Sequence, residues 1–245
     1  MIIVTGPGRS GTSFVASLYR NLGFDPGGKW FDESQAGLES EDVVEANGRI
    51  LRGLHIRGVQ RQLPSLVLRL GQRVLSSSSE RRLRASLANS RLFAGRTPRL
   101  IDWARFDEVV ARSSPSLRAI ADRHEVVKDP RFCLTLGVWA ASGLPIEHVL
   151  VCVRSFDASV KSRMKKGDIA PRSAAGAKNM LAYQLGMCLA ACHDYRIPHD
   201  VVRFPDFLDH PDVMYETMRF PRPVPRERFL EVFARETRLD LVHER

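Results

Sequence analysis

Residues 6–13 form a glycine-rich segment whose composition suits the binding of an anion. The segment reads GPGRSGTS. Its glycines allow several backbone N–H groups to converge on one anion, and the N-terminus of a following helix adds partial positive charge. Arg9 adds a permanent cation. We therefore predict a cradle for a phosphate or sulfate group, formed by Gly8, Arg9, Ser10, Gly11, Thr12 and Ser13.

The same segment differs from the phosphate-binding motif of nucleotide triphosphatases, G-x-x-x-x-G-K-[ST]. Gly6 and Gly11 match the two glycines of that motif, and Ser13 matches its hydroxyl residue. The lysine that reaches the terminal phosphates is replaced by Thr12, and the cation lies inside the loop at Arg9. These differences disfavour the hydrolysis of ATP or GTP.

Residues 8–13 resemble the 5′-phosphosulfate loop of sulfotransferases that use 3′-phosphoadenosine 5′-phosphosulfate (PAPS). Bacterial and carbohydrate-modifying members of that family read P-R-S-G-T-[ST], and this chain reads GRSGTS. The family holds the 3′-phosphate with an arginine that ends a central strand and a serine eight residues later. Arg154 and Ser162 fit that pattern, with Ser155 and Ser159 as weaker alternatives.

The resemblance extends to the C-terminal part of the chain. The run HDVVRFPDFLDHP is similar to a family element in which a strand leads into a YEDLL segment and a proline. Phe204 and Pro205 stand where the family has Tyr and Glu. The resemblance thins between about residues 52 and 122, where we expect acceptor recognition.

The resemblance implies a sulfotransferase that moves a sulfuryl group from PAPS to a hydroxyl or an amine, by in-line displacement and without a metal ion. Arg9 would stabilise charge on the leaving phosphate as well as bind the cofactor. Because the motifs are similar to those of carbohydrate and natural-product sulfotransferases, we expect a sugar or another small-molecule acceptor.

A carboxylate that could remove the acceptor's proton lies in GLESEDVVEAN, residues 37–47. Related bacterial sequences carry a Glu before a helix that ends in Asn, and Glu39 keeps that spacing to Asn47. We therefore expect Glu39 to act as the catalytic base. The alternatives are that Glu39 only caps or solvates a helix N-terminus, or that the base is Asp32, Glu33 or His55.

The segment VVKDPRFCLTL, residues 126–136, resembles a K-D-P-R element of the bacterial relatives. It predicts Lys128 at the carboxyl end of a central strand, where open α/β sheets bind their ligands. Lys128 would orient the sulfate or the acceptor. Otherwise Lys128 and Asp129 would form a structural ion pair. Arg131 could likewise have a role in the site or a structural role.

Two further features could border the site. The loop at 165–172 matches the family segment that often closes over the 3′-phosphate. Trp30, Trp103 and Trp139 could stack on adenine or on a sugar ring, although packing in the core is the commoner role of tryptophan.

The elements that position these residues alternate along the chain. Apolar runs at 2–5, 124–129, 147–155 and 199–204 predict buried parallel strands. Helices are predicted at 12–22, 133–143, 156–164, 173–195, 211–218 and 225–237. The pattern indicates an α/β fold with a central parallel sheet flanked by helices, and the resemblance implies the P-loop-containing sulfotransferase-like fold.

We expect a single domain over residues 1–245. A helical insert at approximately 41–122, with breaks at Pro64, Pro98 and Pro115, follows the first βα unit and is expected to cap the site.

The composition of the 245 residues is that of a globular protein, with 44% hydrophobic and 27% charged residues. The net charge of +9 indicates an anionic ligand. Basic residues do not alternate with aromatic ones, so we expect no nucleic acid partner. We expect no membrane span, because no run approaches about 20 apolar residues. With strand residues from Ile2 onward we expect no targeting segment, and hence a cytoplasmic location.

The four cysteines are predicted to be reduced core residues. Cys188, Cys192 and His193 suggest a metal site, but a second ligand pair at zinc-like spacing is missing, so we expect no metal.

Two alternative functions remain open. The first is a P-loop kinase or nucleotide-binding protein with an atypical phosphate loop, which magnesium dependence would reveal. The second is a non-enzymatic nucleotide or polyanion binder, which would show no turnover.

Overall fold

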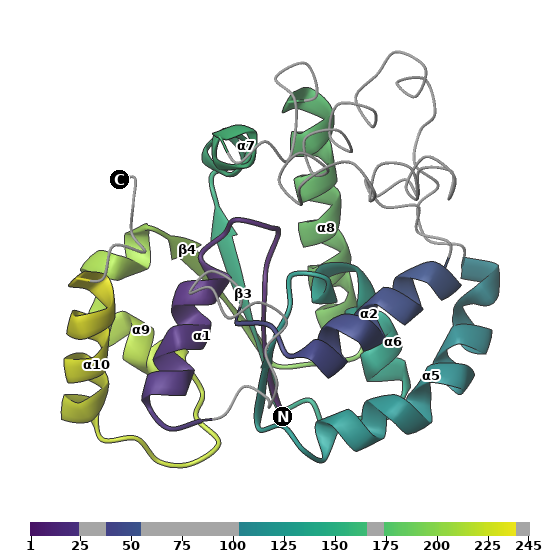
Figure 1. Ribbon diagram of the computed structural model, residues 1–245, viewed down its shortest axis with the longest axis horizontal. Coiled ribbons are helices and arrows are strands. Elements are labelled where there is room, and N and C mark those ends of the chain that lie inside the picture. Colours follow the sequence, from purple (N-terminus) through teal and green to yellow (C-terminus); the bar gives the residue numbers. More distant parts are fainter. Residues whose placement is uncertain (25–37, 55–102, 166–173, 239–245) are drawn as a thin grey trace, which may run out of the picture.

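In the computed structural model of this chain, residues 1–24, 38–54, 103–165 and 174–238 are described. They form an α/β fold in which helices cover both faces of a four-stranded parallel sheet (Figure 1). The strands lie in the order β2-β1-β3-β4 and are, in chain order, β1 (Ile2–Thr5), β2 (Val126–Lys128), β3 (His148–Arg154) and β4 (His199–Phe204). The predicted fold class is therefore confirmed at this level.

The helices follow the strands in the alternation that the sequence predicts. They are α1 (Thr12–Asn21), α2 (Glu41–Gly53), α5 (Phe106–Ala121), α6 (Phe132–Ala141), α7 (Phe156–Lys165), α8 (Ala174–Asp194), α9 (Pro211–Thr217) and α10 (Arg226–Arg238). Short 3₁₀ turns are η1 (Trp103–Arg105) and η3 (Asp206–Asp209).

Strand β1 shows why the strands are almost entirely apolar. Ile3 packs with α2, α5, α6 and α8 in one core, whereas Ile2 and Val4 pack with α1, α9 and α10 in the other. Successive side chains of a strand point to opposite faces, so a strand covered on both faces needs apolar residues at every position.

Strand β2 is an edge strand of the described sheet. It pairs with β1 alone, with Val4 opposite Lys128. The prediction that Lys128 ends a central strand is therefore wrong, although Lys128 does end its strand. Strand order depends on contacts between distant segments, which the local pattern of a strand does not encode.

The expected break at Pro115 is also wrong, because α5 runs unbroken through it. Val109 before the proline, and Leu117 and Ile120 after it, are all buried in the same core. Packing on both sides of Pro115 offsets the cost of the missing backbone donor. The breaks expected at Pro64 and Pro98 lie outside the described residues.

The described ends of the insert at 41–122 are part of the core. Val43, Ala46, Ile50 and Leu54 on α2 pack in the same core as the buried residues of α5 and α6. The rest of the proposed cap lies outside the described residues.

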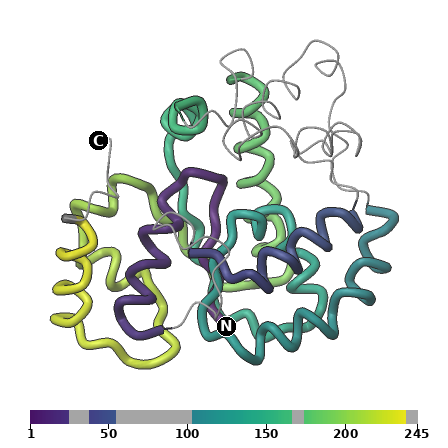
Figure 2. Tube along the Cα trace, in the orientation of Figure 1, coloured from purple at the N-terminus to yellow at the C-terminus, as the bar shows by residue number. Residues whose placement is uncertain are grey.

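The C-terminal helices hold α1 in place. Phe14 on α1 contacts the rings of Phe207 and Phe233 at centroid distances of 5.6 Å each. Asn21 Nδ2 donates to Glu236 Oε1 at 2.9 Å. Figure 2 shows α10 lying beside α1 at the end of the chain's path. The ring contacts of Phe14 thus hold the start of α1, which borders the glycine-rich loop, against the C-terminal part of the chain.

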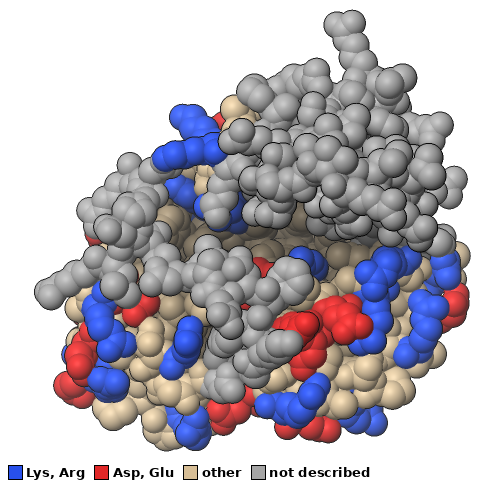
Figure 3. Space-filling view, in the orientation of Figure 1, with Lys and Arg blue, Asp and Glu red and all other residues tan. Residues whose placement is uncertain are grey.

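The described residues show where the charged side chains and the cysteines lie. Figure 3 shows Lys and Arg side chains in several separate groups on one face, with Asp and Glu between them. Among the described residues, no helix is both long enough and apolar enough to cross a bilayer. All four cysteines are free and buried, as expected.

Candidate functional site

The loop between β1 and α1 passes close to β3 and β4, and two glycines make this possible. A Cβ on Gly6 would lie 2.0 Å from the carbonyl oxygen of Cys152. Gly11 has φ 91°, and a Cβ there would lie 2.8 Å from Cδ2 of Phe204. Because neither neighbour can move away cheaply, a side chain at either position would displace the loop.

The remaining loop residues present an open polar surface. A Cβ on Gly8 would meet nothing within 4 Å. Arg9 adopts a left-handed φ of 71° and is exposed. The Ser10 hydroxyl is buried, and no hydrogen-bond partner is found for its oxygen among the described residues. A buried hydroxyl in this situation is one that a bound anion can satisfy. Thr12 is buried at the start of α1, and Ser13 is half-buried.

Arg9 reaches the helix that follows β3. Its Nε donates to Ser162 Oγ on α7 at 3.1 Å. Of the alternatives to Ser162, Ser159 is only 2% exposed and Ser155 is exposed. The structure therefore brings together the glycine-rich loop and α7. The motif resemblance assigns these two segments to the 5′-phosphosulfate and the 3′-phosphate of one cofactor.

Arg154 ends β3 beside the same loop. Its guanidinium carbon lies 5.2 Å from the centroid of the Phe204 ring, at the end of β4. That ring also packs against Gly11. Phe204 thus links Arg154 to the loop, a role that sequence reasoning missed. The sequence did contain a signal for this role, because Phe204 is an aromatic residue at the end of a predicted strand, where the sulfotransferases that the chain resembles have Tyr.

A second group of charged side chains follows β2. Lys128 Nζ donates to Glu39 Oε1 at 2.8 Å, and the Lys128 side chain is only 2% exposed. Arg131 Nη1 lies 3.4 Å from Glu39 Oε2. Glu39 is 19% exposed, so its carboxylate is held between two cations while one side remains open to solvent.

These contacts correct two alternatives. The first alternative was a structural ion pair between Lys128 and Asp129, and it is wrong. Lys128 pairs with Glu39 instead, and Asp129 pairs with Arg131 at 3.0 Å. Glu39 does not merely cap or solvate α2 either. Ser40 is the N-cap residue of that helix, and the Glu39 carboxylate instead binds the two cations.

Asp129 is completely buried, and its carboxylate accepts three hydrogen bonds. They come from Asn47 Nδ2 at 2.9 Å, from the Arg131 backbone at 2.9 Å and from Arg131 Nη1 at 3.0 Å. Burial raises the pKa of Asp129, while the Arg131 charge and the hydrogen bond from Asn47 oppose that shift. Asp129 therefore fixes the guanidinium that contacts Glu39.

Asn47 is the second residue that sequence reasoning missed as a site element. Its Oδ1 accepts from Thr135 Oγ1 at 2.7 Å and from Trp139 Nε1 at 2.9 Å. Both partners are donors, so the amide must direct its nitrogen to Asp129. The spacing from Glu39 drew attention to Asn47, but only packing shows that it anchors Asp129.

The tryptophans are placed differently from one another. Trp139 is fully buried and hydrogen-bonded to Asn47, so stacking of Trp139 on a ligand is wrong. Trp103 is 60% exposed and lies 5.5 Å from the Phe106 ring. Other expected features lie outside the described residues, namely Trp30, Asp32, Glu33, His55 and, apart from Lys165 at the end of α7, the loop at 165–172.

Both charged groups lie at the carboxyl edge of the sheet. The loop follows β1, Arg154 ends β3, and Lys128 ends β2. Thr5 Oγ1 donates to the Asp129 carbonyl at 3.0 Å, which ties the end of β1 to the second group. Open parallel sheets bind ligands at this edge. The arrangement can hold an extended anion along β1 and β3 and place a carboxylate and an ammonium beside it.

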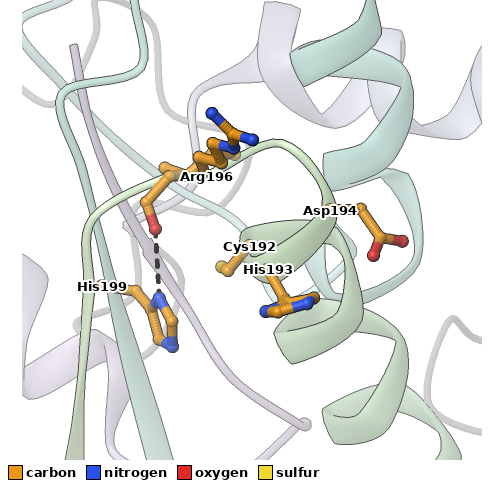
Figure 4. Close-up of a pocket in the computed structure, with 6 residues that line it drawn as sticks. Cys192, His193, Asp194, Arg196 and His199 are labelled. Atoms are coloured by element: carbon orange, nitrogen blue, oxygen red, sulfur yellow. Dashed lines mark hydrogen bonds between the residues drawn. The ribbon is translucent and has the colours of Figure 1, made fainter.

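A depression of about 590 Å³ lies at the opposite edge of the sheet (Figure 4). Its labelled residues come from the end of α8, the turn that follows and the start of β4, and His199 Nδ1 lies 3.1 Å from the Ile197 carbonyl oxygen. Cys192 and His193 line it, and Cys192 also belongs, with Cys188, to the buried core. Among the described residues, no group of three His, Cys, Asp or Glu side chains could hold a metal ion.

The sequence was compared with protein-family models and with curated proteins, and neither comparison found a match. The functional inference therefore depends on the geometry of the site and on the motifs.

Proposed function

We propose that this chain is a PAPS-dependent sulfotransferase that transfers a sulfuryl group to a hydroxyl or amine of a small-molecule or carbohydrate acceptor. The observation that carries the proposal is the hydrogen bond from Arg9 to Ser162. The motif resemblance assigns these residues to the 5′-phosphosulfate and the 3′-phosphate of one cofactor. They are 153 positions apart, yet their side chains meet.

The residues present fit the two charged ends of such a cofactor. The open backbone at Gly8, the buried Ser10 hydroxyl and the start of α1 suit the phosphosulfate. Arg154 and Ser162 suit the 3′-phosphate, because Arg154 ends β3 and Ser162 lies on α7, the helix that follows it. PAPS, when bound, supplies the sulfuryl group that is transferred.

Arg9 has the central role in the proposed chemistry. Its guanidinium is exposed at the loop and can donate to the phosphate oxygen on which negative charge develops. Because the loop backbone and Ser162 hold Arg9, little reorganisation is needed as the charge builds.

The acceptor side of the proposal uses Glu39 and Lys128. Glu39 is the partly exposed carboxylate of the second group, whereas Asp129 is completely buried, so Glu39 is the residue that can accept the proton of the attacking group. Lys128 holds the Glu39 carboxylate in place through their ion pair and orients the sulfate or the acceptor. None of these steps requires a metal ion.

The finer features of the fold belong to the same proposal. The glycine-rich loop after β1 and the arginine at the end of β3 support a P-loop-containing sulfotransferase-like architecture within one domain. The four free cysteines suit a reducing compartment, which supports a cytoplasmic location.

Calorimetric titration with 3′,5′-adenosine bisphosphate, the desulfated product, tests the proposal. The titration is made on the whole chain in magnesium-free buffer, with ADP as the comparison. We expect micromolar binding of the bisphosphate and affinity for ADP that is at least about tenfold weaker, because ADP lacks the 3′-phosphate. A preference for ADP that appears with magnesium would favour a kinase, and a lack of binding to either would contradict the proposal.

A further inference from the structure

A groove of about 580 Å³ lies between α2 and α5, outside the site described above. Four arginines and two serines give it its chemistry. This basic groove is defined by Arg49, Arg52, Arg105, Arg112, Ser113 and Ser116. Blue side chains over α2 and α5 form one of the groups in Figure 3, at the right of that view.

Helical spacing places these arginines on facing sides of the two helices. Arg49 and Arg52 are three residues apart on α2. Arg105 is the N-cap residue of α5, and Arg112 lies two turns further along that helix. A Cβ on Gly53 would lie 2.7 Å from Arg112 Nη2. The missing side chain at Gly53 therefore lets a guanidinium from α5 lie directly against α2.

Among the described residues, two carboxylates contact the arginines of the groove. Glu45 lies 3.5 Å from Arg49, and one carboxylate, Glu108, lies 3.4 Å from Arg105 and 3.6 Å from Arg112. Well-formed charge-assisted hydrogen bonds are about 2.7–2.9 Å long. Within the described part of the chain, the contacts of these two carboxylates to Arg49, Arg105 and Arg112 are all longer than that, and the three arginines line one cavity together with Arg52.

We propose that the basic groove is a second anion site, which binds a ligand that carries a phosphate or sulfate group. Guanidinium groups present paired N–H donors that match the oxygens of such groups, and Ser113 and Ser116 add hydroxyl donors. A bound oxyanion would also relieve the repulsion among the arginines. The site shares no residue with the glycine-rich loop, Arg154 or Ser162, so it does not depend on the proposed function.

Residue-resolved chemical modification of arginine tests this site in the whole chain. Phenylglyoxal modification is followed by mass spectrometry, with and without inorganic pyrophosphate in magnesium-free buffer. We expect pyrophosphate to slow modification of Arg52 and Arg112 several-fold. Arg226 and Arg228 on α10 are the controls, and their modification should be unchanged. Equal protection of all arginines, or protection confined to Arg9, would overturn the proposal.

Variants provide a second measurement. The double variant Arg52→Gln/Arg112→Gln should bind pyrophosphate at this site about tenfold more weakly, as measured by calorimetry. The matched control, Arg226→Gln/Arg228→Gln, removes the same charge elsewhere and should keep the affinity. If both variants bind equally well, the groove is not an anion site. If the groove variant fails to fold, the modification experiment on the unaltered chain decides.

A parallel arm with inorganic sulfate and inorganic phosphate distinguishes the ligand classes. Preferential protection of Arg52 and Arg112 by either ion supports the site and indicates which ester the natural ligand carries. If neither ion protects them at concentrations where pyrophosphate does, the groove requires two linked oxyanions.

Discussion

Arg9 Nε donates a hydrogen bond of 3.1 Å to Ser162 Oγ, and this contact joins the loop after β1 to the helix after β3. Arg9 adopts φ 71°, in the left-handed region, and its side chain reaches α7. In the proposed function the same guanidinium borders both ends of the cofactor. The binding of the cofactor and the stabilisation of charge on the leaving phosphate can then be separated by experiment.

Replacement of Arg9 by alanine should lower turnover far more than it lowers cofactor affinity. The loop backbone and Arg154 would still bind the bisphosphate, but the main donor to the leaving group would be lost. We expect a loss of about 10²–10³ in turnover, as for other single donors to a developing oxyanion. Release of 3′,5′-adenosine bisphosphate during turnover measures this effect. Arg20→Ala at the end of α1 is the control, and near-normal activity of Arg9→Ala would contradict the assignment.

Replacement of Ser162 by alanine should weaken binding of 3′,5′-adenosine bisphosphate. One hydrogen bond to a charged group contributes about 1.5 kcal/mol, so we expect an affinity about tenfold lower. Calorimetric titration measures this loss. Ser155→Ala, at the exposed residue that precedes the same helix, serves as the control and should bind normally. Equal losses in both variants would mean that the 3′-phosphate is not at Ser162.

The strands and the loop could be predicted because their signals are local. Continuous apolar runs mark β1 and β3, and the glycines at 6, 8 and 11 mark the loop between β1 and α1. The motif resemblance assigns Arg9 and Ser162 to one cofactor, but the contact between their side chains was not predicted. Spacing within one segment cannot show that two segments meet.

The network beneath Glu39 could not be predicted for the same reason. Asn47 and Asp129 are 82 positions apart and meet only because α2 packs against α6. The partner of Lys128 was likewise misjudged, because its neighbour in sequence, Asp129, points into the core toward Asn47. The break expected at Pro115 failed because burial of the flanking apolar residues outweighed the local cost of proline.

Replacement of Asn47 by alanine should destabilise the protein. The variant leaves the buried Trp139 indole without its acceptor, and it removes one hydrogen bond each from Asp129 and Thr135. We expect the free energy of unfolding to fall by about 2–4 kcal/mol. Urea unfolding measures this change. Glu45→Ala on the exposed face of the same helix should change it by no more than about 0.5 kcal/mol, and equal effects of both variants would contradict the network.

The histidine that begins β3 should make stability fall in mild acid. Burial lowers the pKa of His148, whereas its hydrogen bond to Asp200 opposes this shift and the Arg219 and His199 charges add to it. The unfolded chain therefore binds more protons than the folded chain just below pH 6.5 or so, and stability is lost as the pH falls through that range.

Urea unfolding between neutral and mildly acidic pH measures this dependence. The variant His148→Gln keeps a partner for Asp200 but cannot titrate, so its free energy of unfolding should change less with pH than that of the unaltered chain. The exposed His210 offers a control, because His210→Gln should leave the dependence as it is. An unchanged pH dependence in His148→Gln would contradict the prediction.

The ion pair between Lys128 and Glu39 allows structural and catalytic roles to be separated. Glu39→Gln removes one partner of a pair whose lysine is only 2% exposed, so we expect a loss of about 3 kcal/mol of stability together with the loss of turnover. The double variant Lys128→Gln/Glu39→Gln removes both charges and should recover much of the stability, as urea unfolding would show. Turnover should not recover, because the proton acceptor is still missing. If turnover returns with stability, Glu39 serves only to hold Lys128, and the base must be another residue.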